Sequence, residues 1–452
     1  MNFNQTNRSK SRAHRVFTEV IKTATSKELL KQHLNTPLYQ NAYNLIAGSA
    51  ITSVLGFIFW ILAARLYSAE EVGLASAALS ALGLIALFSE LGMGIGLIRF
   101  LPGAGKGGND MLNTCLTFTG SASIIIALIF LAGVNIWSPP LSSLCQNPVF
   151  FTSFIVMAVL MALHPLVANT FLTKRSSKFV VFTNLINQLL SLTFIVLASF
   201  LLNNVYGIFF SSGFGTAIAW AIAILYFLPR VQTGYRPFPM IRKWVIVELG
   251  FYSIGNYIGR LLLQVTALIL PIMVVNTLGA EQNAYFFVGW AITSTFRIIP
   301  ASIFNSLFAE VSNEDIAIRA KTLKSLRLML ILVIPTVLLI LIIAPYLLLL
   351  FGHTYSENST LLFRVLILST IPWGINYLYI SIARATKGIK RVIYVAGAAA
   401  GLSLGLSYFL MMKMGLLGVG IGYLAGLGIV AVAVAINLWR SYHSQAGLLG
   451  RV

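Results

Sequence analysis

The feature that most constrains this chain is a succession of apolar stretches, each long enough to cross a membrane. A helix rises 1.5 Å per residue, so about 20 apolar residues span a hydrocarbon core of about 30 Å. We therefore predict an all-α polytopic membrane protein with about twelve transmembrane helices. The predicted spans are 41–64, 73–98, 113–137, 149–172, 179–202, 205–228, 248–276, 284–309, 328–350, 361–383, 391–412 and 416–439.

A low content of charged residues supports this interpretation. Only 10% of the 452 residues are charged and 58% are hydrophobic, whereas an ordinary soluble domain has about 25% charged residues. The chain therefore lacks the polar surface that a soluble protein of this length needs. Its two cysteines, Cys115 and Cys145, are too few for a secreted disulfide-rich scaffold.

The distribution of basic residues predicts the orientation. With the N-terminus placed inside, only Arg65 and Lys413 fall in loops on the outer side. Cytoplasmic loops carry an excess of Lys and Arg, so we predict a cytoplasmic (inner) membrane protein with both termini cytoplasmic. This explains the net charge of +19 without a nucleic-acid partner, which such an excess would suggest in a soluble protein. The inner loops hold Arg99, Lys106, Lys174, Arg175, Lys178, Arg230, Arg236, Arg242, Lys243, Arg319, Lys321, Lys324, Arg327, Arg384, Lys387, Lys390 and Arg391.

The spans divide into two groups of six. The junction "LYSAEEVG" after the first span resembles "TLGAEQNA" after the seventh, and aligning them brings the flanking helices into register. Internal repeats of this kind place a substrate site between two lobes. The predicted divisions are a basic cytoplasmic tail (1–40), an N-lobe (41–228), a cytoplasmic linker (229–243), a C-lobe (244–439) and a cytoplasmic C-terminal tail (440–452).

The loops offer no place for enzymatic chemistry. The external loops are short, and the segment "LPGAGKGGND" has Gly107 after Lys106 where a phosphate-binding loop needs Ser or Thr. No group of Cys and His has the spacing of metal ligands. We therefore predict a transporter rather than an enzyme, with no cofactor or metal.

Polar residues inside the predicted spans are the candidate site, because such residues are costly in a membrane. Asn256, Arg260 and Gln264 share one face of the seventh span, together with Ser253. Thr293 and Arg297 share a face of the eighth span. Both arginines lie near mid-membrane, which predicts a cationic, water-filled cavity. The alternative is that a structural carboxylate, Glu90 or Glu248, neutralises each arginine.

Three further groups have two interpretations each. Glu90 is either a partner for Arg297 or a protonation site, since a buried carboxylate without a partner is protonated near neutral pH. As a protonation site, Glu90 would couple transport to a proton or sodium gradient. The stripe Asn44, Gly48, Thr52 and Gly56 of the first span either binds substrate or allows close helix packing. The same choice applies to the polar stripe of the fifth span, formed by Asn184, Asn187, Gln188 and Ser191.

The stretch 41–101, with "ARLYSAEEVG" and "SELGMGIGLIRF", resembles the N-terminal signature of polysaccharide-biosynthesis flippases. These are the Wzx-type members of the multidrug/oligosaccharidyl-lipid/polysaccharide exporter (MOP) superfamily. The stretch 271–313 resembles the matching part of their second lobe. The resemblance implies a MATE-like fold of two six-helix lobes around a central cavity. It also implies that Arg260 and Arg297, at the matching positions, bind an anionic lipid-linked substrate.

The expected function is therefore alternating-access flipping of an undecaprenyl-diphosphate-linked oligosaccharide for surface polysaccharide biosynthesis. The expected partners are this lipid-linked oligosaccharide, membrane lipids, a polysaccharide polymerase and a chain-length regulator. The main alternative is a cation-coupled, MATE-like exporter of drugs or small metabolites, which would need an acidic or aromatic cavity. A membrane glycosyltransferase would need larger external loops, and the related lipid II flippases typically have fourteen helices.

Overall fold

The computed structural model describes residues 37–202, 204–313 and 318–449, and all regular secondary structure in these ranges is helical. The predicted tail 1–40 therefore lies outside the described residues except for its last four. Of the predicted tail 440–452, only helical backbone as far as residue 449 is described.

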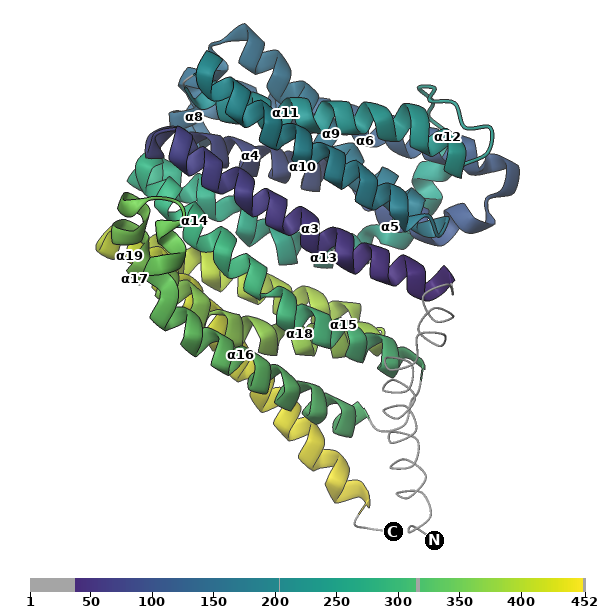
Figure 1. The fold of residues 1–452 in the computed structure, drawn as a ribbon. Helices are drawn as coiled ribbons and strands as arrows, with labels where there is room; N and C mark the ends of the chain where they lie inside the picture. The colour runs from purple at the N-terminus through teal and green to yellow at the C-terminus, as the bar shows by residue number, and fades with distance from the viewer. Residues whose placement is uncertain (1–36, 203, 314–317, 450–452) are drawn as a thin grey trace, which may run out of the picture.

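The first half of the chain, which we call the N-lobe, lies above the second half, the C-lobe, in Figure 1. The N-lobe contains α3 (Pro37–Leu66), α4 (Ala69–Ser89), α5 (Met93–Phe100), α6 (Gly108–Ala132), α7 (Val134–Trp137), α8 (Pro139–Cys145), α9 (Pro148–Thr173), α10 (Ser177–Leu201), α11 (Val205–Ile222) and α12 (Leu228–Val231). The C-lobe contains α13 (Lys243–Leu278), α14 (Ala280–Phe296), α15 (Ile298–Asn313), α16 (Ile318–Leu349), α17 (His353–Leu368), α18 (Thr370–Ala385) and α19 (Ile389–Leu449).

Eleven helical segments of the described chain are long and apolar enough to cross a membrane, and the last of them contains two crossings. Within α19, Gly415 has φ 59° and ψ −139°, so the helix folds back on itself there. The Ser407 hydroxyl donates to the Val419 carbonyl at 3.0 Å, and Gly422 lies against the Ser407 backbone. The described residues thus form twelve crossings, and the predicted multi-pass, all-helical membrane fold is confirmed.

Four of the predicted continuous spans are broken, the third of the twelve only near its end, at Gly133 between α6 and α7. The second span is divided into α4 and α5 by Leu91 (φ 47°) and Gly92 (φ 81°). The eighth is divided into α14 and α15 at Arg297, and the tenth into α17 and α18 at Ser369. Two of the charged candidates therefore lie at breaks, because Glu90 is the C-cap of α4 and Arg297 is the C-cap of α14.

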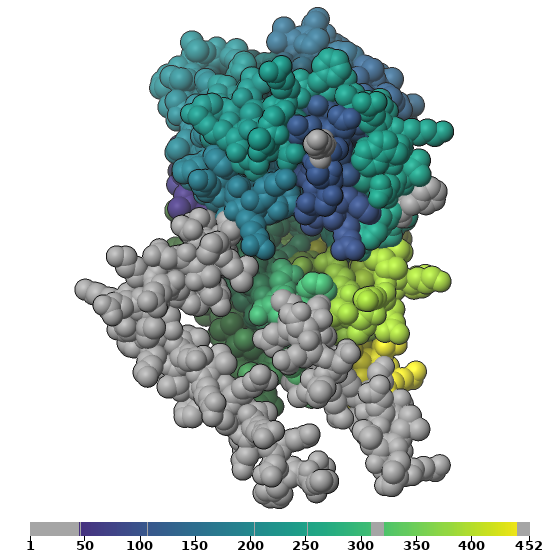
Figure 2. Space-filling view, turned by 90° about the vertical axis from the view of Figure 1, so that its right-hand side faces the viewer, coloured from purple at the N-terminus to yellow at the C-terminus, as the bar shows by residue number. Residues whose placement is uncertain are grey.

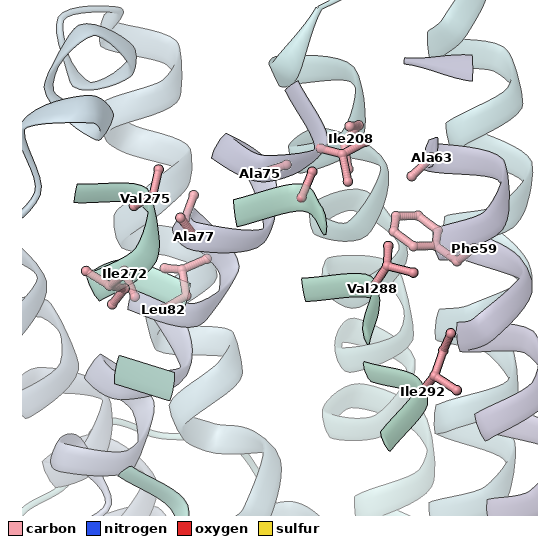
Figure 3. Close-up of a cluster of buried hydrophobic side chains, with 14 of the residues drawn as sticks. Phe59, Ala63, Ala75, Ala77, Leu82, Ile208, Ile272, Val275, Val288 and Ile292 are labelled. Atoms are coloured by element: carbon pink, nitrogen blue, oxygen red, sulfur yellow. The ribbon is translucent and has the colours of Figure 1, made fainter. Parts of the chain in front are cut away.

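One hydrophobic core extends across both lobes. Small residues on α4, such as Ala75 and Ala78, are fully or almost fully buried and allow α13 and α14 to pack closely against it. Figure 3 shows part of this core, in which side chains from α3, α4 and α11 meet Ile272 and Val275 of α13 and Val288 of α14. The interface between the lobes is therefore built mainly around α4.

The lobes are joined at the end of the bundle opposite to the loops that are rich in Lys and Arg. The Asn283 side-chain amide (α14) donates to the Gly73 carbonyl at 2.8 Å and to the Ser76 hydroxyl at 3.1 Å on α4. Arg65 of α3 donates to the Leu350 carbonyl at 3.0 Å, beyond α16. A side chain at Gly73 would collide with the backbone of Ala280. Direct backbone contact therefore closes this end.

The other end carries Arg99, Arg230 and Arg384, and we call it the basic end. Figure 2 looks onto the basic end and shows the surface hollowed along the boundary between the lobes. The two ends thus differ, with the lobes in direct contact at one and separated by a recess at the other.

Candidate functional site

An ion pair joins the two lobes at Arg260 of α13 and Glu90 of α4. The guanidinium makes two contacts with the carboxylate: Nη1 to Oε1 at 2.8 Å and Nη2 to Oε2 at 2.7 Å. The Glu90 side chain is 1% exposed, whereas the Arg260 side chain is 28% exposed. A bidentate ion pair of this kind fixes the geometry of both side chains. It leaves part of the guanidinium open to other anions.

The break after α4 positions Glu90. Positive φ angles at Leu91 and Gly92 turn the chain sharply, and Gly92 lies so close to Ser253 of α13 that a β-carbon there would be 2.8 Å from the Ser253 β-carbon. The Tyr257 hydroxyl, one turn before Arg260, donates to the Leu87 carbonyl at 3.1 Å. The end of α4 and the middle of α13 are thus held together by backbone contacts on either side of the ion pair.

Arg297 has a different environment, although it lies at a similar break. It is 8% exposed, and its Nη2 donates to the Ser369 hydroxyl at 3.3 Å. Its guanidinium carbon lies 4.6 Å from the ring centre of Trp290 and 5.1 Å from that of Tyr423. No carboxylate contacts it in the described part of the chain, and Nε has no hydrogen-bond partner there. Aromatic faces attract cations, so they compensate this charge.

Of the two interpretations of Glu90, the pairing with Arg297 is wrong, and Glu90 instead neutralises Arg260, as the structural-carboxylate alternative predicted for an arginine. The break at Glu90 turns its carboxylate toward α13, whereas the contacts of Arg297 are all within the C-lobe. The two arginines therefore share no partner among the described side chains. Glu248, the other candidate carboxylate, is exposed and forms no ion pair with any described residue.

The remaining predicted site residues differ in their exposure. Asn256 and Gln264 are exposed along the same helix as Arg260. Thr293 is buried and donates to the Gly289 carbonyl within its own helix at 2.8 Å. The side chain of Asn44 lies outside the described residues. In the same stripe, Gly48 lies against Val181 of α10, as the packing interpretation predicts, whereas Gly56 faces the side-chain amide of Gln188 across a polar cavity.

Two cavities are lined by polar groups. A cavity of about 390 Å³ at the basic end of the C-lobe is lined by Tyr252, Gly255, Asn256, Phe308, Arg384, Lys387 and Ile389. A smaller one of about 110 Å³ in the N-lobe is lined by Gly56, Phe59, Trp60, Leu79, Asn187, Gln188, Ser191 and Ser212. The sequence indicated three of the residues of the smaller cavity as a polar stripe. It indicated Arg384 and Lys387 only as basic loop residues, because nothing in their spacing reveals the cavity.

The family model for "Polysaccharide biosynthesis protein" matches residues 38–312. No curated protein matches the chain. Among solved structures, one described as "Lipid II flippase MurJ, inward closed conformation" is 14% identical, with a TM-score of 0.71 over 87% of each chain. An inward-facing multidrug resistance MATE family transporter of the MOP superfamily is also 14% identical, with a TM-score of 0.66 over 89% of this chain and 96% of that one.

A third structure belongs to a MOP superfamily transporter from Pyrococcus furiosus, whose description reports reverse polarity of the binding pocket. It is 11% identical, with a TM-score of 0.57 over 91% of this chain and 96% of that one. At these identities the likeness shows the fold alone, and that fold is the one the MOP transporters share. Because the family model covers more than half of the sequence, this chain belongs to the polysaccharide biosynthesis protein family.

Proposed function

We propose that this protein flips an undecaprenyl-diphosphate-linked oligosaccharide across the cytoplasmic membrane, with its basic end in the cytoplasm. The family and the MOP fold support a flippase or transporter. One of the structural neighbours is itself described as a lipid II flippase. The excess of Lys and Arg at the basic end supports the orientation, because such residues are retained in cytoplasmic loops.

The observation that carries the proposal is the position of Arg260. Its guanidinium lies where the two lobes meet, is partly exposed, and is bound by a single carboxylate on the opposite lobe. Arginine matches the geometry of phosphate as well as that of carboxylate. A diphosphate entering between the lobes can therefore replace Glu90 at Arg260, and the two lobes then lose the contact that joins them there.

Electrostatics favours this direction of transport. Moving one charge across 100 mV changes its free energy by about 2.3 kcal/mol, so export of an anion from a negative interior needs no nucleotide. The proposal includes no bound cofactor. A proton or sodium gradient is a further possible driving force, with Glu90 as the candidate coupling residue once it is displaced from Arg260.

The polar side chains along α13 and in the N-lobe cavity are suited to the oligosaccharide. Asn256 and Gln264 are exposed, and amides both donate hydrogen bonds to sugar hydroxyls and accept them. A cation-coupled exporter of drugs is the second candidate, since MATE transporters share the fold. The charge of Arg260 opposes a cationic substrate, which favours the anionic lipid.

The test uses purified protein in liposomes that contain a fluorescent prenyl-diphosphate-linked saccharide. We expect the label in the inner leaflet to become accessible to an outside quencher only when the protein is present. A cationic dye loaded into the same liposomes should be retained. Export of the dye without movement of the lipid would overturn the proposal and favour the second candidate.

A further inference from the structure

We propose that the cavity at the basic end of the C-lobe binds the phosphate groups of a membrane-lipid anion through Arg384 and Lys387. The cavity has a volume of about 390 Å³. On the same measure a single water needs only about 10–15 Å³, so there is room for a diphosphate. The inference rests on the proposed function only where it names the lipid-linked diphosphate as one source of these phosphates.

The lining of the cavity has an unbalanced charge. Among the described residues of its lining, Arg384 and Lys387 are charged and none is acidic. Both are exposed and form no ion pair with the described residues. Glu248 lies one turn before Tyr252 on α13 but is not part of the lining. An arginine fork and a lysine ammonium together are a common means of binding phosphate oxygens.

The backbone holds the two cations in place at the end of α18. The amide of Lys387 donates to the Arg384 carbonyl at 3.1 Å, and the amide of Gly388 donates to the Ala383 carbonyl at 2.7 Å. Lys387 has φ 55°, a left-handed conformation at which glycine is usual after a helix. On the opposite wall, a β-carbon at Gly255 would lie 3.3 Å from the Ile389 side chain, so glycine allows α19 to begin close to α13.

The cavity adjoins the ion pair between the lobes. Asn256 lines the cavity, and Arg260 follows it by one helical turn, about 6 Å along α13. The ring of Tyr252 contacts that of Phe100 in the N-lobe edge to face, with ring centres 5.3 Å apart, within the range of about 4.5–7 Å usual for such pairs. A phosphate bound by Arg384 and Lys387 would therefore lie beside the lobe boundary, on the helix that carries Arg260.

Basic residues in this loop also help to set membrane orientation, so the test needs a control that removes the same charge. Lys390 and Arg391 provide it, because they are exposed, lie just after Lys387 in the first turn of α19 and are not among the described residues that line the cavity. The two proteins to compare are Arg384→Gln/Lys387→Gln and Lys390→Gln/Arg391→Gln. Equal melting temperatures would establish that both are folded.

The first arm measures binding of farnesyl diphosphate to full-length protein in phosphatidylcholine nanodiscs. We expect the cavity variant to bind about tenfold more weakly than wild type or worse, since each charged hydrogen bond to phosphate contributes substantially to binding. The control variant should stay within about twofold of wild type, because it loses only long-range attraction. Equal weakening in both variants would overturn the proposal, because charge alone would then explain the effect.

The second arm distinguishes the source of the phosphate. It counts phosphatidylglycerol molecules that remain bound to each protein by native mass spectrometry. If the cavity variant loses binding of farnesyl diphosphate but keeps binding of phosphatidylglycerol, the site is assigned to the lipid-linked diphosphate. Loss of phosphatidylglycerol alone assigns it to a phospholipid headgroup, which keeps the site but leaves the proposed function to the flipping assay. Wild-type binding of both probes by the cavity variant would overturn the proposal.

Discussion

At the scale of single residues, the two arginines of α13 and α14 are stabilised by different means. Arg260 has a carboxylate partner on the other lobe, whereas Arg297 has aromatic rings and one serine hydroxyl in its own lobe. A desolvated cation over an aromatic face gains about 2 kcal/mol, less than the cost of burying an isolated charge. Arg297 also caps the C-terminus of α14, where the helix dipole favours a positive charge.

The first prediction concerns the pair between the lobes. Arg260→Ala leaves the buried Glu90 carboxylate without its partner, which we expect to lower the free energy of unfolding by about 3–5 kcal/mol. The double variant Glu90→Gln/Arg260→Met removes both charges and should recover most of this stability, as judged from the melting temperature in detergent. Polymer export in a deletion host should be lost in both variants. Normal export by the stable double variant would contradict a role for Arg260 in binding the substrate.

The second prediction concerns Arg297. Arg297→Met fills a similar volume without a charge, so we expect a melting temperature equal to or above that of wild type. Arg297→Ala leaves a cavity beside Trp290 and Tyr423 and should cost about 2–5 kcal/mol. If both variants were equally unstable, the hydrogen bond to Ser369 rather than packing would hold this region together. Export by the Met variant then shows whether Arg297 also contacts the substrate.

At the scale of helices, the sequence predicted most elements and missed their breaks. Hydropathy over about 20 residues predicts a span well, because a membrane helix must satisfy its backbone internally. The same average hides a single residue such as Leu91, whose positive φ divides α4 from α5. The Glu90–Arg260 pair joins residues 170 positions apart, so its existence depends on how the lobes pack and not on any local pattern. The cavity beside Arg384 also depends on the packing of distant helices, so the sequence does not predict it.

The third prediction concerns topology, for which α8 and α17 are suitable probes. On a background without native cysteines, Glu357→Cys should react with a membrane-impermeant maleimide from outside, whereas Arg230→Cys at the basic end should not. In the wild-type protein, native Cys145 offers a second readout, because burial raises the pKa of its thiol to about 11. Its labelling should be slow at pH 7 and rise about tenfold per pH unit up to that value. Protection of position 357 in intact cells would contradict the twelve-helix arrangement.

At the scale of the whole molecule, the two ends of the lobe interface are closed to different extents. The end opposite the basic loops is closed by direct contacts, among them Asn283 on Gly73 and Arg65 on Leu350. The basic end has a recess along the lobe boundary (Figure 2). Solved structures in the MOP fold include both inward-facing and outward-facing conformations, with TM-scores to this chain of 0.66 and 0.62. Under the proposed function, the closed end is therefore the part that we expect to separate for release on the far side.

The last prediction tests that separation. Ser138, just before α8, donates to the Asn276 side chain at 3.2 Å, and Asn276 donates to the Trp137 carbonyl at 2.6 Å. These contacts join the N-lobe to the end of α13 at the closed end. We expect a Ser138→Cys/Asn276→Cys protein, linked by a short bis-methanethiosulfonate reagent, to lose flipping and to recover it on reduction.

The matched control is His353→Cys/Glu357→Cys, whose positions lie one turn apart on α17 with side chains 3.3 Å apart. This link lies within one helix, so lobe movement does not stretch it, and flipping should persist after complete cross-linking. Because both pairs are compared after complete linking by the same reagent at the same end of the bundle, a difference between them isolates the motion of the lobes. Undiminished flipping by a fully linked Ser138→Cys/Asn276→Cys protein would mean that substrate leaves by a route that does not open this end.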